Sequence, residues 1–286
     1  MKLFALIILS FLLSFSALAD DAGGCQIELL LDCDLDMPKE SQPSGWTFGV
    51  GVATAVNVPV YIGAKETRSA ILPIPYINYR SPNLKIGQGG IVARLFDSEK
   101  WLLSVSLSGA IPVDSDDAEA RKGMPDINAI FEFGPSLKYY LVGDDSSPDA
   151  IFLDMNIRQA RTIKFTNLKL TSSPSILMRK GLSQTFFGGK VNTRLKLGYE
   201  FVSEDYANEF YGVSPEYMTD ERDAFVAPGG FAGFRVNGGV RWQLKRHIVS
   251  SFFAYADISG AKYVDSPLVK SKQHLYGGLV YFYLFE

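Results

Sequence analysis

Apolar and polar side chains alternate with a period of two in residues 190–203, and again in residues 231–245. The first stretch carries an apolar face formed by Val191, Thr193, Leu195, Leu197, Tyr199 and Phe201. A strand points successive side chains to opposite faces, whereas a helical stripe would need recurrence at i, i+3 and i+4. The spacing therefore predicts β-strands with one apolar and one charged wall, both longer than the common length of ~5–6 residues.

Similar alternation recurs along most of the chain. Together with the two stretches above, it predicts eleven strands, the others being 46–57, 70–79, 84–96, 101–111, 127–142, 151–158, 168–179, 248–259 and 274–285. Bacterial single-chain barrels have an even number of strands. The twelfth is either residues 27–31 or a product of dividing 84–96 at its glycines. We expect an all-β fold, a transmembrane antiparallel β-barrel of about 12 strands, with about 10 as the alternative.

The connections between these strands differ in length. Residues 204–226 and 260–273 form long loops, whereas only a few residues around Lys245–His247 join two neighbouring strands. Short turns on one rim and long loops on the other are typical of outer-membrane barrels. A soluble sandwich or lipocalin-like barrel would also alternate, but the strand length and the aromatic final strand favour the membrane. Pro73 and Pro75 remove two ladder donors, so their strand is expected where pairing is weak or bulged.

The N-terminal residues have the pattern of an export signal. Lys2 precedes an apolar run, and Ala17 and Ala19 supply a small-residue cleavage site, which predicts a signal peptide over 1–19. We expect a polar periplasmic segment over 20–44 and the barrel over 45–286, in the outer membrane of a Gram-negative cell. In an exported chain, Cys25 and Cys33 predict a local disulfide. Lipidation of Cys25 is disfavoured, because Ala22 stands where a lipoprotein signal usually has Leu.

The charged faces of the predicted strands supply the candidate lumenal residues. They are Lys138, Arg158, Arg194, Lys196, Glu200, Arg235, Arg241 and Lys245, with Glu132 and Asp154 on the same faces. Charges inside a barrel must pair or be hydrated. The excess of cations predicts that an open lumen would prefer anions. The net charge of the whole chain is −3, too mild to indicate a nucleic-acid partner.

No catalytic, metal or cofactor motif is apparent in the sequence. The two histidines and two cysteines lie in unrelated places, which gives no metal signature. Outer-membrane lipid hydrolases pair a serine with a histidine base, so Ser266 or Ser271 with His274 is the one candidate pair. No spacing rule supports it, and we expect a non-enzymatic protein without cofactors.

Several short motifs resemble the MipA/OmpV family of outer-membrane proteins over roughly residues 45 to 286. They are Tyr61-Ile62-Gly63, Pro73-x-Pro75 leading to Tyr79, Gly123-Met124-Pro125-Asp126-Ile127, Phe210-Tyr211-Gly212-Val213-Ser214, Ser266-Pro267-Leu268-Val269 and Gly277-Gly278-Leu279-Val280-Tyr281-Phe282. Their order and spacing together carry the resemblance. Two features depart from it: the chain ends on Glu286 after Phe285, and the segment holding Cys25 and Cys33 lies outside the similar region.

The resemblance implies an outer-membrane protein in contact with lipid. The namesake of the family is a scaffold that links a lytic transglycosylase to a murein synthase, a penicillin-binding protein. Other members are described as porin-like or as adhesion proteins, and the family offers no catalytic residues. The expected function is therefore a scaffold for peptidoglycan-remodelling machinery. The alternatives are a small outer-membrane channel and, less favoured, an outer-membrane lipid hydrolase.

Overall fold

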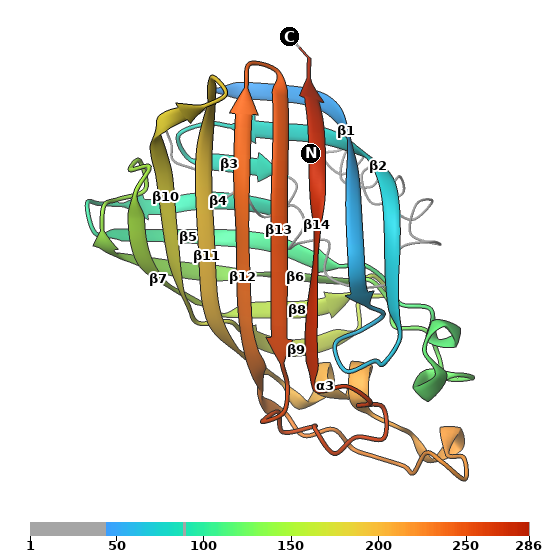
Figure 1. The fold of residues 1–286 in the computed structure, drawn as a ribbon. Coiled ribbons are helices and arrows are strands. Elements are labelled where there is room, and N and C mark those ends of the chain that lie inside the picture. Colours follow the sequence, from blue (N-terminus) through green and yellow to red (C-terminus); the bar gives the residue numbers. More distant parts are fainter. Residues whose placement is uncertain (1–43, 88–89, 286) are drawn as a thin grey trace.

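The chain folds into an antiparallel β-barrel (Figure 1). The computed structural model describes residues 44–87 and 90–285, so the predictions for the signal peptide, for Cys25 and Cys33 and for residues 27–31 fall outside the described residues. Its strand segments are β1 (Gly45–Pro59), β2 (Thr67–Arg80), β3 (Leu84–Gly87), β4 (Gly90–Asp97), β5 (Trp101–Ala110), β6 (Ile130–Val142), β7 (Ala150–Asn156), β8 (Arg158–Thr162), β9 (Asn167–Ser172), β10 (Ser175–Phe186), β11 (Gly189–Val202), β12 (Gly230–Leu244), β13 (His247–Asp257) and β14 (Gln273–Leu284).

These segments make a closed barrel of 12 strands over the described residues. Two of the strands are each interrupted once: β7 continues into β8 beyond Ile157, and β9 continues into β10 beyond Pro174. β6 pairs with β7 and then with β8, and β10 pairs with β11 to complete the ring. The expectation of about twelve strands is confirmed, and the alternative of ten is wrong.

The twelfth strand comes from the stretch 84–96, which divides at its glycines into β3 and β4. β3 pairs with β2 through Tyr79–Ile86 and Arg80–Lys85. This hairpin is much shorter than β2, so the wall is lower between β2 and β5 in the described structure. β2, with Pro73 and Pro75, forms one side of this low section, which agrees with the weak pairing expected from its prolines.

The two rims differ as the sequence predicts. One, called here the short-turn rim, carries the connections 81–83, 98–100, 143–149, 187–188 and 245–246. The other, called the long-loop rim, carries the connections 60–66, 111–129, 163–166, 203–229 and 258–272. The short-turn rim lies at the top of Figure 1, beside the C-terminus.

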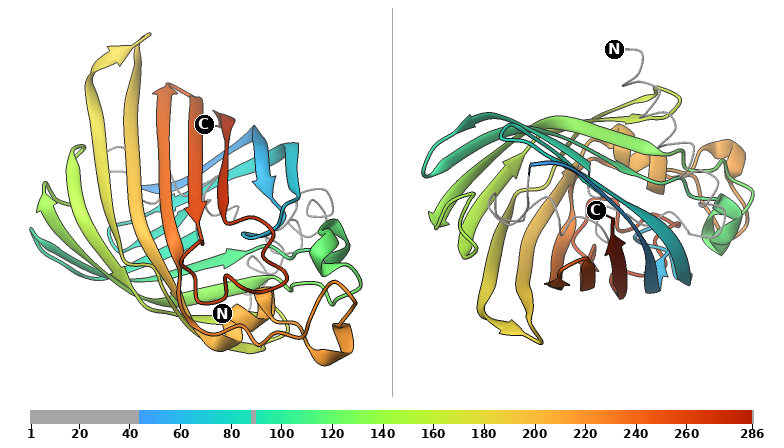
Figure 2. Two further views of the ribbon diagram at one scale, coloured as in Figure 1. Left: turned by 60° about the horizontal axis from the view of Figure 1, so that its bottom comes forward. Right: turned by 90° about the horizontal axis from the view of Figure 1, so that it is seen from above.

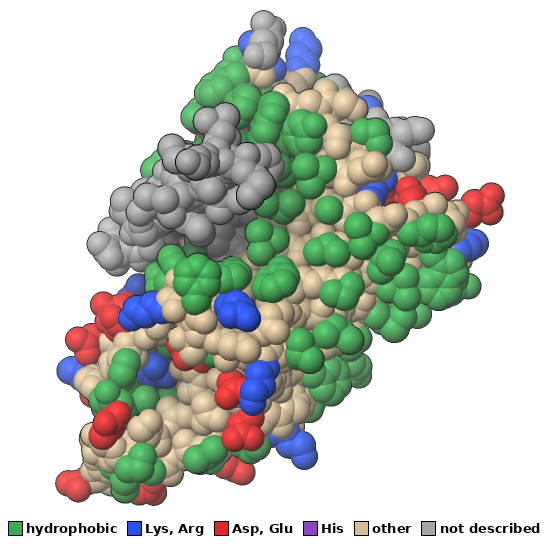
Figure 3. Space-filling view, turned by 180° about the vertical axis from the view of Figure 1, so that it is seen from behind, with side chains coloured by type: hydrophobic (Ala, Val, Ile, Leu, Met, Phe, Trp, Pro, Cys, Tyr) green, Lys and Arg blue, Asp and Glu red, His purple; other side chains and the backbone are tan. Residues whose placement is uncertain are grey.

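The alternation places apolar side chains on the outer wall. Trp46, Phe48, Val50 and Val52 of β1 are about half exposed, and Leu275 and Leu279 of β14 are more than half exposed. Seen from behind, hydrophobic side chains cover much of the outer wall (Figure 3). Such a surface suits lipid contact. Within the described residues, no helix has the length and apolar character needed to cross a membrane.

The interior is only partly polar. The inner faces of β1, β2, β13 and β14 pack together through Ala53, Tyr76, Ile248, Phe252, Val280, Phe282 and Leu284. The rings of Tyr76 and Phe282 meet edge to face at 4.9 Å. A side chain on Gly51 would collide with the ring and backbone of β14, so glycine there lets Phe282 lie across β1. The barrel is therefore packed on one side, and its charged groups gather on the other.

Candidate lumenal site and family assignment

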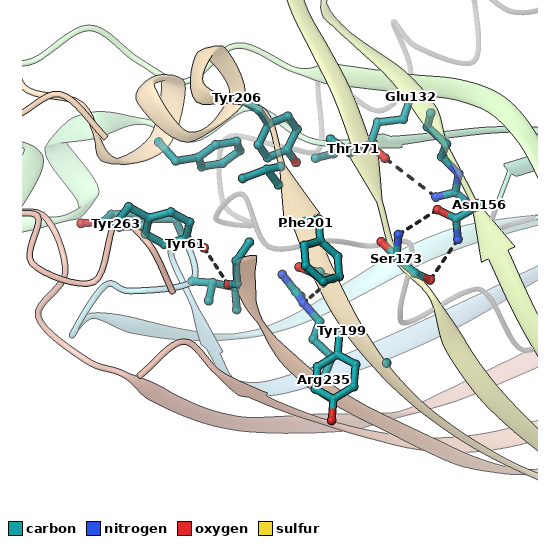
Figure 4. Close-up of a pocket in the computed structure, with 18 of the residues that line it drawn as sticks. Tyr61, Glu132, Asn156, Thr171, Ser173, Tyr199, Phe201, Tyr206, Arg235 and Tyr263 are labelled. Carbon is teal, nitrogen blue, oxygen red and sulfur yellow. Dashed lines mark hydrogen bonds and ion pairs between the residues drawn. The ribbon is translucent and has the colours of Figure 1, made fainter. Parts of the chain in front are cut away.

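A cavity of about 130 Å³ lies inside the barrel near the long-loop rim. Its wall is formed by the inner faces of β6, β8, β9, β11 and β12, and its lid by aromatic residues of the loops and of helix α3 (Glu204–Tyr211). Figure 4 shows Glu132, Asn156 and Arg235 on the wall side, with Tyr206 by the helix and Tyr61 and Tyr263 among the loops. The site thus has a charged wall and an aromatic lid.

Helix α3 begins where the sequence caps it. The Ser203 hydroxyl accepts a hydrogen bond from the backbone N–H of Tyr206 at 3.3 Å, and Glu204 and Asp205 follow in the first turn. Such a cap satisfies an amide that has no partner within the helix, and acidic residues there suit the helix dipole. Ala207 and Tyr211, four residues apart, share the buried face. The helix therefore packs Ala207 and Tyr211 into the core, and its Tyr206 and Phe210 also line the cavity.

The lid is a hydrophobic core in its own right. The ring of Tyr211 stacks on Tyr263 at 3.9 Å, and its hydroxyl donates to the carbonyl of Ile62 at 2.6 Å. Tyr61 donates to the carbonyl of Leu268, and Tyr263 donates to that of Ala232. The three loops 60–66, 203–229 and 258–272 are joined in this way to one another and to β12. The left panel of Figure 2 shows α3 and these loops lying across the long-loop end.

Burial keeps the tyrosine hydroxyls of the lid neutral. It raises the pKa of Tyr263 to about 12, and it raises the pKa values of Tyr211 and Tyr206 well above their ordinary range. These hydroxyls therefore act as hydrogen-bond donors rather than as bases at neutral pH. Arg121 is also buried here and donates to the carbonyls of Phe210 and Pro125. Burial lowers the pKa of its guanidinium, which nevertheless ties the loop 111–129 to α3.

The charged wall is arranged as ion pairs across neighbouring strands. Arg158 lies 3.8 Å from Glu132 and donates to the hydroxyls of Ser106 and Ser108. Arg235 lies 2.6 Å from Glu200 on the adjacent strand. Lys196 lines the same cavity. Ion pairs of this kind satisfy charges inside a barrel, so the site can hold a small polar group with a slight preference for an anion.

An amide bridges the two strand interruptions. Asn156 donates from its side chain to the carbonyl of Ser173 at 3.1 Å and accepts from the Ser173 amide at 3.0 Å. Both residues stand where β7 gives way to β8 and where β9 gives way to β10. The bridge satisfies backbone groups that the interruptions remove from the ladder, and it forms part of the cavity wall.

A second charged cluster, which the sequence did not single out, lies at the short-turn rim. The turn 143–149 places Asp145 among buried cations: it contacts Arg94 directly, lies 3.9 Å from Lys85, and accepts from the Tyr140 hydroxyl at 3.2 Å. Burial by itself would raise the pKa of Asp145, but the charges of Lys85 and Arg94, with those of Lys138 and Arg179, outweigh it and hold that pKa below its usual range.

Arg179 fastens this turn to the barrel. Its guanidinium donates to the carbonyls of Ser147 at 2.7 Å and of Asp144 at 3.0 Å. Arg80, another buried cation, belongs to the same cluster. Lys85, Arg94 and Arg179 stand inside predicted strands and Arg80 directly follows one, so an isolated charge at an inward position was the available signal.

The sequence-predicted lumenal residues fall in three places. Arg158, Lys196, Glu200 and Arg235 line the cavity, as do Glu132 and Asn156. Lys138 stands over the buried ring of Phe152 at 4.9 Å, and Arg241 is buried beside Gln243, both nearer the short-turn rim. Arg194 lies directly opposite Arg179 in the register of β10 and β11. Lys245 differs from the expectation: β12 ends at Leu244, and Lys245 lies exposed in the turn with a positive φ of 51°.

The candidate serine–histidine pairs are engaged elsewhere. His274 accepts at Nε2 from the amide of Gly63 at 2.9 Å. The hydroxyl of Ser266 donates to the carbonyl of Tyr211, and that of Ser271 donates to the carbonyl of Gln273. These contacts serve the loop structure. Among the described residues there is also no group of three His, Cys, Asp or Glu side chains placed to hold a metal ion.

Comparison with known proteins places the chain in a family. The family model described as "MltA-interacting protein MipA" matches residues 50–285. No curated protein matches. A solved structure titled "Bacterial polysaccharide outer membrane secretin" aligns with a TM-score of 0.41 at 9% identity, covering 85% of this chain and 99% of that one; at this level the likeness carries no argument. The family match spans almost the entire barrel, which agrees with the outer-membrane architecture described above. The chain belongs to the MipA family of MltA-interacting proteins.

Proposed function

We propose that this protein is a non-enzymatic scaffold in the outer membrane that brings a lytic transglycosylase together with a murein synthase. The observation that carries the proposal is the family match over residues 50–285, since the family is named for its interaction with MltA, a lytic transglycosylase. The apolar outer wall supports a position in lipid. The murein synthase and the scaffold role are the steps that the proposal adds.

The closed long-loop end supports a scaffold over a channel. Tyr61, Tyr211 and Tyr263 pack in one core with the loops around them, so the barrel is covered there by side chains with satisfied hydroxyls. A passage for ions would need this lid to move. The cation-rich interior favours the channel alternative, with anion preference. A planar-bilayer recording separates the two: a silent barrel supports the scaffold, and stepwise conductance supports the channel.

Peptidoglycan enzymes would reach the protein from the periplasm, which short turns face in barrels of this kind. The short-turn rim offers exposed positions at Lys100, Lys190 and Lys245. A photo-crosslinking amino acid at Lys100 or Lys245, in the full-length protein in growing cells, should capture a lytic transglycosylase and a murein synthase.

The matched control places the same crosslinker at Asp220 or Glu221, which are exposed on the long-loop rim. These positions should capture neither enzyme. Capture from the long-loop positions alone, or capture of neither enzyme from any of the four positions, would overturn the proposal.

A further inference from the structure

The lumenal cavity contains a buried side-chain amide without a hydrogen-bond partner. Asn237 lines the cavity, only 8% of its surface is exposed, and its Oδ1 accepts no hydrogen bond from the described residues. A buried polar atom without a partner destabilises the fold, and native proteins retain few of them. An amide offers both donors and an acceptor. Asn237 is therefore suited to a polar molecule that enters the cavity.

Lys196 stands next to this amide on the neighbouring strand. The two residues are direct register partners in β11 and β12, and both line the cavity. The two arginines of the cavity, Arg158 and Arg235, each lie beside a glutamate. Lys196 makes no ion pair or hydrogen bond within the part of the chain that the structure describes. A cation inside a barrel is stabilised by an opposite charge, so Lys196 is the group that suits an anion.

A glycine opens the wall beside Lys196. Gly198 follows two residues later on the same face of β11 and lines the cavity. Its register partner on β10 is Ser175, which is 8% exposed and whose Oγ also lacks a partner in the described structure. A Cβ on Gly198 would lie 2.9 Å from the Cβ of Ser175, so glycine leaves the space beside the hydroxyl open. An ammonium, an amide and a hydroxyl are thus neighbours on three adjacent strands.

The lid adds an aromatic surface to the same cavity. Tyr206 and Phe210 of α3 line it with their rings stacked at 5.3 Å, and Tyr211 and Tyr263 line it beside them. Aromatic rings pack well against the C–H faces of sugars, whose hydroxyls then bind amides and charged side chains. A bare inorganic anion would gain nothing from such rings. The volume of about 130 Å³ admits a small molecule.

We propose that this cavity binds a small sugar acid, a molecule with one carboxylate and a body rich in hydroxyl groups. Lys196 pairs with the carboxylate, Asn237 and Ser175 bind oxygens of the molecule, and the rings of α3 cover its C–H face. This inference goes beyond the scaffold proposal, because it concerns the inside of the barrel. Crosslinking of enzymes at the short-turn rim can succeed or fail without any effect on sugar-acid binding.

Titration calorimetry of the full-length protein in detergent micelles tests the ligand class. The probe is glucuronate, and the comparison ligands are glucose, which lacks the carboxylate, acetate, which lacks the sugar body, and inorganic phosphate, a bare anion. Glucuronate should bind saturably and at least about tenfold more tightly than each of the other three, because only it makes both kinds of contact. Absence of saturable glucuronate binding, or equal affinity for acetate or phosphate, would overturn the proposal.

Lys196→Met tests the pairing with the carboxylate. The change removes the charge and keeps an unbranched side chain. Affinity for glucuronate should fall by about tenfold, whereas affinity for glucose should stay the same, so the variant loses its preference for the acid. Lys190→Met, at the exposed end of the same strand, is the matched control and should bind like the natural protein. An undiminished preference in Lys196→Met would refute the role of this lysine.

Asn237→Leu separates binding from stability. Because the amide has no partner in the described structure, its replacement should leave the urea midpoint of the folded band unchanged or raise it. Affinity for glucuronate should nevertheless fall by about tenfold. Asn192→Leu, on the same face of β11 as Lys196 but outside the cavity lining, should leave the affinity unchanged. A lower urea midpoint with unchanged affinity in Asn237→Leu would show that this amide serves the fold and would overturn the proposed site.

Discussion

At the long-loop end, helix α3 and the surrounding loops bring Tyr61, Tyr211 and Tyr263 into one buried cluster. At the short-turn end, the turn 143–149 places Asp145 among Lys85, Arg94 and Arg179. The first cluster is made mainly of aromatic area and hydroxyl-to-carbonyl hydrogen bonds between neutral groups. The second cluster is made of buried charges, in which the carboxylate of Asp145 contacts Arg94 and lies near Lys85.

This difference indicates different responses at the two ends. Apolar packing is insensitive to salt and to moderate changes of pH, whereas charged clusters are sensitive to both. The tyrosine lid is therefore expected to be a permanent part of the fold. The charged cluster around Asp145 is expected to respond to both salt and pH.

Among the variants that distinguish the two ends, Tyr211→Ala should have the largest effect on stability. The change removes a buried ring that stacks on Tyr263, and truncation of a buried aromatic side chain costs about 3–5 kcal/mol. We expect the segment 203–229 to become sensitive to limited proteolysis while the heat-modifiable barrel band persists. Tyr217→Ala, in the same loop but only partly buried, is the control and should stay resistant. A resistant Tyr211→Ala variant would show that the lid does not depend on this ring.

Asp145→Asn should destabilise the opposite end. Breaking a buried ion pair by removing one partner costs about 3–5 kcal/mol, and we expect the lower end because an amide can still accept from the Tyr140 hydroxyl. The measurement is the urea midpoint of the folded band on a gel. Asp97→Asn, which removes a half-exposed partner of Arg94, should shift the midpoint much less. Equal shifts would mean that burial of Asp145 is unimportant.

Extremes of pH should loosen the two ends separately. The pKa of Tyr263 is raised to about 12. Its contribution to stability is therefore complete below the unfolded pKa of ~10 and is lost as the pH rises toward the folded pKa. A pKa shift of two units corresponds to about 2–3 kcal/mol of stability. The pKa of Asp145 is lowered, so its contribution is present above ~3.9 and is lost as the pH falls below it.

Proteolysis of residues 203–229 should therefore accelerate between about pH 10 and 12, and Tyr263→Phe should remove that step. The turn 143–149 should become accessible in acid, and Asp145→Asn should remove that dependence. One common transition at a single pH would contradict the separate behaviour of the two ends.

The smallest perturbation tests which end faces outward. An epitope inserted next to Asp220 lies in an exposed part of the loop 203–229 and should leave the barrel folded. Long loops face outside the cell in barrels of this kind, so antibody should label the epitope on intact cells. An epitope beside Lys245 should be labelled after permeabilisation only. The reverse pattern would place the tyrosine lid in the periplasm.

The sequence predicted the wall of the barrel well, because period-two alternation directly records which side chains face lipid. For the same reason it assigned Arg158, Lys196 and Arg235 to the charged faces of their strands, and in the structure all three line the cavity. Alternation does not predict where a strand ends. Lys245 continues the alternating pattern of β12 in the sequence, but β12 ends at Leu244 and Lys245 has the positive φ of a turn residue. The helix 204–211 was missed, although Ser203 followed by Glu204 and Asp205 was a usable start signal.

The cluster around Asp145 could not be predicted from spacing. Its members come from β2, β3, β4, β10 and the turn 143–149, and they meet only because of the register and closure of the sheet. Alternation gives the face of each residue but not its height in the barrel or its neighbours around the ring. The tyrosine lid has the same limitation, since its rings lie on loops whose residues carry no periodic pattern.

The pairing of β1 with β14 has a consequence for how the molecule forms. The hydroxyl of Thr54 on β1 donates to the carbonyl of Leu279 on β14, 225 residues further along the chain. Contacts between such distant residues are slow to form because the intervening chain must first be ordered. Until they form, β1 and β14 both present unpaired edges to which other strands can add. Changes along this seam should therefore alter how long the newly made chain remains vulnerable to aggregation, even where the finished barrel is unaffected.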